Sequence, residues 1–116
     1  MTEILENVYN RLAFEKFEFG FTKAKFSKHY LGKSETYFSY LLSSGNDESA
    51  NVLLMLWGKL NKEHQSCAIA ANNTDHEFRK HMLTEWVTLY RELSNDVFTA
   101  ICDRAHKMQI EDSASV

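Results

Sequence analysis

Residues 20–41 read GFTKAKFSKHYLGKSETYFSYL, and the glycine, threonine and serine residues of this stretch predict where its helices begin and end. Gly20 and Gly32 stand where helices commonly end, because glycine adopts the left-handed backbone conformation without strain. A threonine and a serine follow these glycines, and both residue types cap helix N-termini with their side-chain oxygens. The stretch therefore predicts two short helices, over residues 22–31 and 35–43, joined by a tight turn.

Amphipathic patterns flank this stretch on both sides. Residues 2–17 predict a helix, because their apolar side chains recur at helical spacing. A serine-rich loop over residues 43–47 precedes another helix, which carries the apolar run 52–57. Over residues 75–108 the apolar positions recur every three or four residues, which predicts one long helix or two helices divided near residues 94–96. With four glycines and no proline, the chain is predicted to be all-α.

Composition limits the class of protein. The 116 residues are 44% hydrophobic and 25% charged, which is typical of a single small globular domain. No apolar run approaches the roughly 20 residues that span a bilayer, so we expect no membrane partner. The acidic N-terminus lacks the features of a secretory signal, and two isolated cysteines indicate reduced thiols. These features predict a cytoplasmic protein.

The net charge of −3 averages two unlike halves. Residues 1–62 hold eight basic and seven acidic side chains, whereas residues 63–116 hold five basic and nine acidic ones. The net charges of the two halves are therefore +1 and −4. Within the first half, residues 22–34 contain four lysines and no acid. Such a segment can attract a polyanion even in an acidic protein, although it also suits a solvated helix face.

Motifs that would indicate catalysis are lacking in the sequence. His76 and His81 are five residues apart, so they fall on different helix faces and do not form the zinc-binding His-Glu-x-x-His pattern. Cys67 and Cys102 have no cysteine neighbour at metal-ligand spacing, and buried packing is the simpler interpretation. There is no nucleophile motif of the Gly-x-Ser-x-Gly type. We therefore expect no enzymatic activity, no metal and no cofactor.

The order of these elements resembles the helix-turn-helix domain of the Cro/C1 (lambda-repressor-like) family. The resemblance covers about residues 12–60: the Gly-Phe-Thr at 20–22, the helix and glycine turn over 22–32, and the serine-led helix over 34–41. It ends with Ser49-x-x-x-Leu53-x-x-Leu56-x-x-x-Leu60. The resemblance implies a compact helix-turn-helix bundle of four short helices, followed here by a long C-terminal helix or helical hairpin.

The resemblance also implies roles for individual residues. Its core positions are Phe26, Tyr30, Phe38 and Leu41. The residues placed at DNA include four lysines near phosphates and five residues in or before the recognition helix, which enters the major groove. The DNA-binding residues implied in this way are Lys23, Lys25, Lys28, Lys33, Ser34, Glu35, Thr36, Tyr37 and Tyr40.

Two departures from the family pattern keep a second function open. Ser27 stands where the family usually has alanine at the helix crossing. The predicted recognition helix, residues 35–43, contains no Arg, Lys, Asn or Gln, which make the best bidentate base contacts. The leading hypothesis is a small dimeric DNA-binding transcriptional regulator of bacterial or phage type. The alternative is the same fold used as a protein-interaction module, such as an adaptor or a phage-encoded inhibitor of a host complex.

The C-terminal apolar stripe predicts self-association. We expect a helix-turn-helix domain over residues 1–62, a helical oligomerisation segment over 63–110 and a disordered tail over 111–116. The stripe is longer than a 62-residue domain can easily cover, which favours burial against a second copy. A hairpin folding back on the same chain is the alternative. The predicted dimerisation residues are Met82, Trp86, Leu89, Leu93, Val97 and Ile101.

Overall fold

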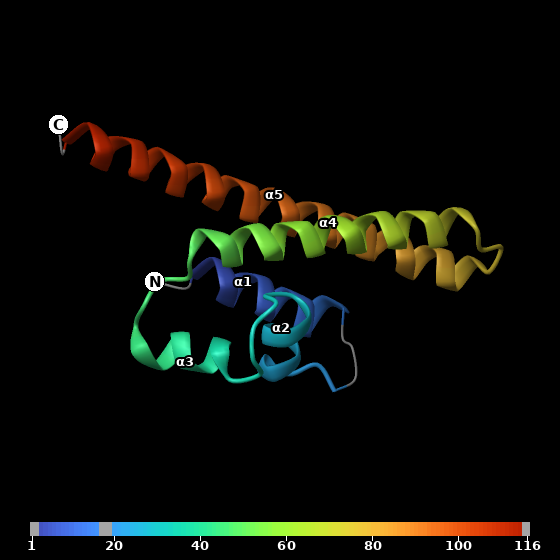
Figure 1. Cartoon of the computed structure of the whole chain (residues 1–116). Helices are drawn as coiled ribbons and strands as arrows, with labels where there is room; N and C mark the ends of the chain where they lie inside the picture. The colour runs from blue at the N-terminus through green and yellow to red at the C-terminus, as the bar shows by residue number, and fades with distance from the viewer. Residues whose placement is uncertain (1–2, 17–19, 115–116) are drawn as a thin grey trace.

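The computed structural model describes residues 3–16 and 20–114, which form helices and the turns between them. The all-α prediction is confirmed. Figure 1 shows the short helices gathered on one side of a pair of long helices, and the molecule is 60 Å in its longest dimension. In chain order the elements are α1 (Glu3–Arg11), the π-helical turn η1 (Leu12–Lys16), α2 (Lys23–His29), α3 (Tyr37–Ser44), α4 (Ala50–Asn72) and α5 (Glu77–Ala114).

The two long helices form an antiparallel hairpin joined by residues 73–76 (Figure 1). α5 is one continuous helix, so the break that polar residues 94–96 allowed does not occur. The physical reason is that Ser94 finds a partner on α4: its hydroxyl donates a hydrogen bond to Asn61 Oδ1 at 2.7 Å. None of the helices within the described ranges combines enough length and apolar character to cross a bilayer.

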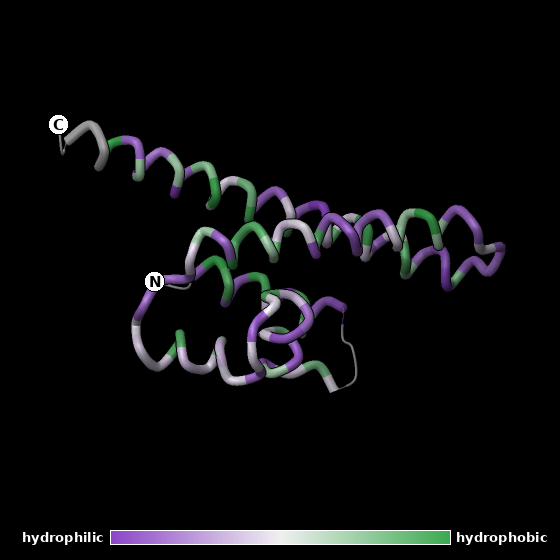
Figure 2. The backbone as a smooth tube through the Cα atoms, viewed as in Figure 1, coloured by the Kyte–Doolittle hydropathy of each residue, from purple (hydrophilic) through white to green (hydrophobic). Residues whose placement is uncertain are grey.

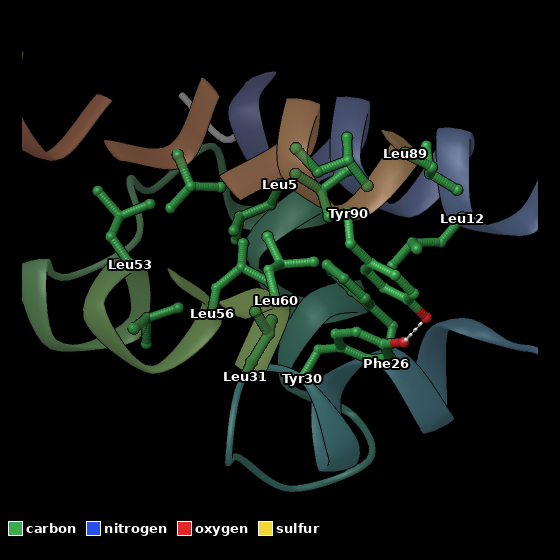
Figure 3. Close-up of a cluster of buried hydrophobic side chains, with 14 of the residues drawn as sticks. Leu5, Leu12, Phe26, Tyr30, Leu31, Leu53, Leu56, Leu60, Leu89 and Tyr90 are labelled. Carbon is green, nitrogen blue, oxygen red and sulfur yellow. Dashed lines mark hydrogen bonds between the residues drawn. The ribbon is translucent and has the colours of Figure 1, made fainter. Parts of the chain in front are cut away.

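A continuous hydrophobic core joins the short helices to the hairpin (Figure 3). Leu5 of α1, Phe26 of α2 and Leu56 of α4 are fully buried in it. Tyr30 and Tyr90 share a buried hydrogen bond at 3.1 Å between their hydroxyl oxygens, and burial raises the pKa of Tyr90. α4 runs across the predicted domain boundary at residue 62. The two predicted segments therefore share one core.

The predicted dimerisation stripe lies largely against its own chain. Leu89, Leu93 and Val97 are 4%, 0% and 0% exposed within a single copy. The other three predicted residues, Met82, Trp86 and Ile101, are partly buried. α4 continues to Asn72 and packs along α5, so the hairpin alternative describes this stripe.

The C-terminal end of α5 also differs from expectation. Residues 111–114 continue the helix, although the sequence predicted a disordered tail from residue 111. Extending an existing helix adds one hydrogen bond for each residue ordered, and no proline or glycine interrupts it here. The predicted tail residues 115–116 lie outside the described residues, as do residues 2 and 17, the two ends of the first predicted helix.

Candidate nucleic-acid interface

Capping interactions define α2 as the sequence predicted. Thr22 Oγ1 accepts a hydrogen bond from the backbone N–H of Lys25 at 3.2 Å. The turn after α2 contains Gly32 at φ +67°, in the left-handed region. A Cβ at this position would also lie 2.7 Å from Met55 Cε of α4. Gly32 is therefore needed for the backbone conformation, whereas the Met55 methyl is the end of a flexible, exposed side chain that can move aside.

A buried serine connects α2 to α3. Ser27 is fully buried, and its Oγ accepts a hydrogen bond from the backbone N–H of Phe38 at 3.0 Å. This N–H belongs to the first turn of α3, where amides have no partner within the helix. The N-cap residue of α3, Thr36, makes no capping bond with its side chain. Ser27, which stands where the Cro/C1 pattern usually has alanine, thus caps α3 from the neighbouring helix.

We expect Ser27→Ala to lower the free energy of unfolding by about 1–3 kcal/mol, because it leaves the Phe38 N–H buried and unpaired. Urea denaturation measures this change. Ser39→Ala is the matched control, since Ser39 is exposed on α3 and should change stability by less than about 0.5 kcal/mol. Equal effects of the two substitutions would contradict the capping role.

α3 begins two residues later than predicted. Its first residue is Tyr37, whereas the sequence predicted a helix from Glu35 capped by Ser34. The backbone N–H of Tyr37 instead donates to the Ser34 carbonyl at 3.1 Å, which closes a turn over residues 34–37. Because Ser27 supplies the cap from α2, the chain needs no serine cap at residue 34. Ser34, Glu35 and Thr36 are consequently exposed turn residues in front of the helix.

The outward face of α3 is polar and aromatic. Tyr40 is 59% exposed, and Ser39 and Ser43 are exposed beside it. Tyr37, by contrast, is half-buried against the core. Burial and the nearby Glu48 carboxylate raise the pKa of the Tyr37 hydroxyl. Of the two tyrosines expected to face a groove, Tyr40 is therefore the one whose side chain is mostly accessible.

The four predicted lysines do not form one cluster. All four are exposed, but Lys25 lines a cavity of about 280 Å³, together with His29 of α2. Lys16 of η1 and Lys59 of α4 line the same cavity, and Lys59 Nζ lies 3.0 Å from Glu63 Oε1. Lys16 lies six residues before the lysine-rich stretch and Lys59 lies 25 residues after it, and both belong to other elements than α2, so no helix-face pattern connected them to Lys25.

The remaining lysines, Lys23, Lys28 and Lys33, lie outside this cavity. Lys33 Nζ sits 5.7 Å from the centre of the Tyr37 ring, a cation–π contact at the turn before α3. The site predicted from the sequence thus separates Lys25, which lines a cavity with η1 and α4, from the other predicted residues, which lie outside that cavity on α2, on α3 and in the turn between them.

One family model matches nearly the whole of the described chain. A model described as "Family of unknown function (DUF6626)" matches residues 5–109. The chain belongs to this family. The DUF6626 match runs from α1 into the last part of α5, so the short helices and the hairpin belong to one family unit. Comparisons with curated proteins and with solved structures give no match.

Two histidines of this DUF6626 chain, His76 and His81, have local structural contacts. His76 Nδ1 accepts a hydrogen bond from the backbone N–H of Arg79 at 3.2 Å, which caps the start of α5. His81 Nε2 lies 3.1 Å from Glu85 Oε1 one turn later. Within residues 3–16 and 20–110, no three His, Cys, Asp or Glu side chains are grouped so that they could hold a metal ion.

Proposed function

We propose that the chain binds duplex DNA through α2 and α3, as a small helix-turn-helix regulator of bacterial or phage type. The observation that carries the proposal is the buried hydrogen bond from Phe38 N–H to Ser27 Oγ, which fixes α3 against α2 while its polar face stays exposed. The core residues that the Cro/C1 resemblance implies support it, since all of them are buried: Phe26, Tyr30, Phe38 and Leu41.

The diameter of α3 suits a DNA groove. An α-helix with its side chains is about 10–12 Å across, and the major groove of B-DNA is about 12 Å wide. In this proposal Tyr40 enters the groove from α3, and Glu35 and Thr36 approach base edges from the preceding turn. Ser34 and the exposed edge of Tyr37 complete the same surface.

Positive charge on α2 and in the turn before α3 supports contact with phosphates. Lys23, Lys28 and Lys33 are exposed in a stretch without acidic residues. Neutralising phosphates with lysines releases counterions, so the proposed affinity depends steeply on salt concentration. Lys25 and the other lysines of the 280 Å³ cavity add positive potential behind this surface.

The proposal is tested by reversing two phosphate-contacting charges. We expect Lys23→Glu with Lys28→Glu to weaken binding of random-sequence duplex at least about tenfold at low salt. The slope of log affinity against log salt should fall by about 2, because two phosphate contacts are lost. Electrophoretic retardation or fluorescence anisotropy across a salt series measures both quantities.

The matched control is Lys62→Glu with Lys107→Glu, which changes the net charge equally at lysines of α4 and α5. This pair should retain most of the affinity. Equal loss in the two double variants would contradict the proposed surface. Absence of salt-sensitive binding by the unmodified protein would contradict DNA binding itself.

One observation favours the second candidate function, a protein-interaction module. The outward face of α3 presents the 59% exposed Tyr40 among serines, and residues 35–43 contain no Arg, Lys, Asn or Gln. Exposed tyrosine is typical of protein interfaces, where its ring and hydroxyl both make contacts. In that case Tyr40→Ala would abolish partner binding, whereas the duplex assay would show no retardation.

A further inference from the structure

The C-terminal part of α5 projects beyond the rest of the described chain. α4 begins at Ala50, close to the level of Arg104, whose Nη1 donates a hydrogen bond to the Glu48 carbonyl at 2.8 Å. Past this level α5 continues to Ala114 with no other described helix beside it (Figure 1). Apolar positions recur along this projecting part (Figure 2), and Met108 and Ile110 are 53% and 54% exposed.

An apolar hollow lies at the base of the projection. It has a volume of about 80 Å³ and is formed where the start of α4 meets α5. Leu53 and Leu54 line it from α4, and Ile101, Ala105 and Met108 line it from α5. The hollow therefore lies next to the projecting helix.

The residues around the hollow form a regular pattern. Phe98, Ile101, Ala105 and Met108 follow one another at spacings of three, four and three, the pattern of a coiled-coil seam. On α4 the pattern is extended by Trp57, whose ring centre lies 5.9 Å from that of Phe98, and by Leu54, which is 50% exposed. We call these residues the apolar seam: Leu54, Trp57, Phe98, Ile101, Ala105 and Met108.

We propose that the apolar seam is the interface of a two-fold symmetric homodimer, in which the projecting end of each α5 packs over the hollow of the other copy. The projection and the hollow lie next to each other on the same chain, so a two-fold rotation can bring each projection to its partner's hollow. Ala105 has a small side chain, which permits close approach of the two α5 backbones.

The size and charge of the seam fit a second copy. Several of its large side chains are about half exposed, so the seam offers on the order of 400 Å² of apolar area per copy. A standard interface buries about 800 Å² per partner, of which somewhat more than half is apolar. Arg104 is the charged side chain that lines the hollow. Its Nη2 lies 3.8 Å from Oε1 of the Glu48 carboxylate, so its charge already has a partner within one copy.

This dimer differs from the one that the sequence predicted. Of the six residues predicted from the stripe, only Ile101 belongs to the apolar seam, and the others are buried or partly buried within a single copy. The inference concerns self-association without DNA. It can therefore fail or hold independently of the proposed DNA binding.

Analytical ultracentrifugation of the full chain without DNA tests the proposal. Between about 1 μM and 1 mM we expect the mass to rise from that of one chain, 13.5 kDa, to twice this value. Met108→Glu places a charge in the seam and should raise the dimer dissociation constant at least about tenfold. The matched control is Phe78→Glu, because Phe78 is 68% exposed at the opposite end of α5, and this variant should dimerise normally.

Chemical crosslinking gives a second readout. Cys102 is exposed beside the seam, whereas Cys67 is buried, so a flexible bismaleimide should join two copies through Cys102. The yield should fall in Met108→Glu, with circular dichroism confirming that the variant remains helical. A single-chain mass over the whole concentration range would overturn the proposal. Equal dissociation of Met108→Glu and Phe78→Glu would also overturn it.

Discussion

Phe26→Ala is expected to lower the free energy of unfolding by about 3–5 kcal/mol, the usual cost of removing a fully buried aromatic ring. Phe26 lies at the centre of an aromatic cluster. Its ring centre is 5.1 Å from Phe38, 5.5 Å from Tyr9 and 5.8 Å from Tyr30. The substitution therefore removes contacts with α1, with α3 and with the end of α2. Because small domains are stable by only about 5–15 kcal/mol, much of the total stability would be lost.

Urea and thermal denaturation followed by circular dichroism measure this loss. Phe78→Ala provides the control, since it removes an identical side chain that is 68% exposed and should cost less than about 1 kcal/mol. Similar midpoints for the two variants would show that the aromatic cluster does not hold the short helices together. The Phe26 variant should also lose duplex binding, because α3 would no longer be fixed against α2.

Arg104→Ala is expected to cost about 3 kcal/mol, because it leaves the Glu48 carboxylate buried without its nearby cation. Glu48 is 3% exposed, and the guanidinium of Arg104 lies 3.8 Å from its Oε1. Glu48 Oε2 has no hydrogen-bond partner among the described residues. The substitution also removes the hydrogen bond from Arg104 to the Glu48 carbonyl, which holds the loop before α4 against α5.

A double-mutant cycle separates these effects. In a Glu48→Gln background no buried charge remains, so Arg104→Ala should cost at least about 1 kcal/mol less than in the unmodified chain. The cycle is best measured at protein concentrations at which sedimentation shows a single chain, because Arg104 also lines the apolar hollow and the proposed dimer would contribute to stability. If Arg104→Ala costs the same with and without the Glu48→Gln substitution, the charge of Glu48 is not the cause.

Local features of the chain were predictable from the sequence. Thr22 and Ser49 cap α2 and α4, and Gly45 ends α3 in the left-handed conformation. Each of these features depends on hydrogen bonds that span three or four residues, so the residue types alone predict them. The buried positions of the short helices were also correct, since helical spacing places Phe26 and Tyr30 on one face.

The start of α3 and the grouping of the lysines were not predictable in the same way. Ser27 caps α3 across eleven residues of sequence, which removes the need for a cap at Ser34. Lys16 and Lys59 meet Lys25 and His29 at one cavity only because η1, α2 and α4 pack together. Contacts between distant residues depend on which helix faces meet, and the local pattern of residues does not carry that information.

The long helices show most clearly which features local sequence predicts and which depend on contacts between distant residues. By itself, the sequence determined that residues 75–108 are largely helical and that their apolar stripe must be covered, because helical spacing and hydrophobic burial are local properties of residue type. Only the tertiary structure decided what covers it. α4 extends to Asn72 and buries Leu93 and Val97 within the chain, while Met108 stays exposed on the projecting end of α5. A stripe can be buried equally well by its own chain or by a second copy, and the choice depends on the length and position of the neighbouring helix.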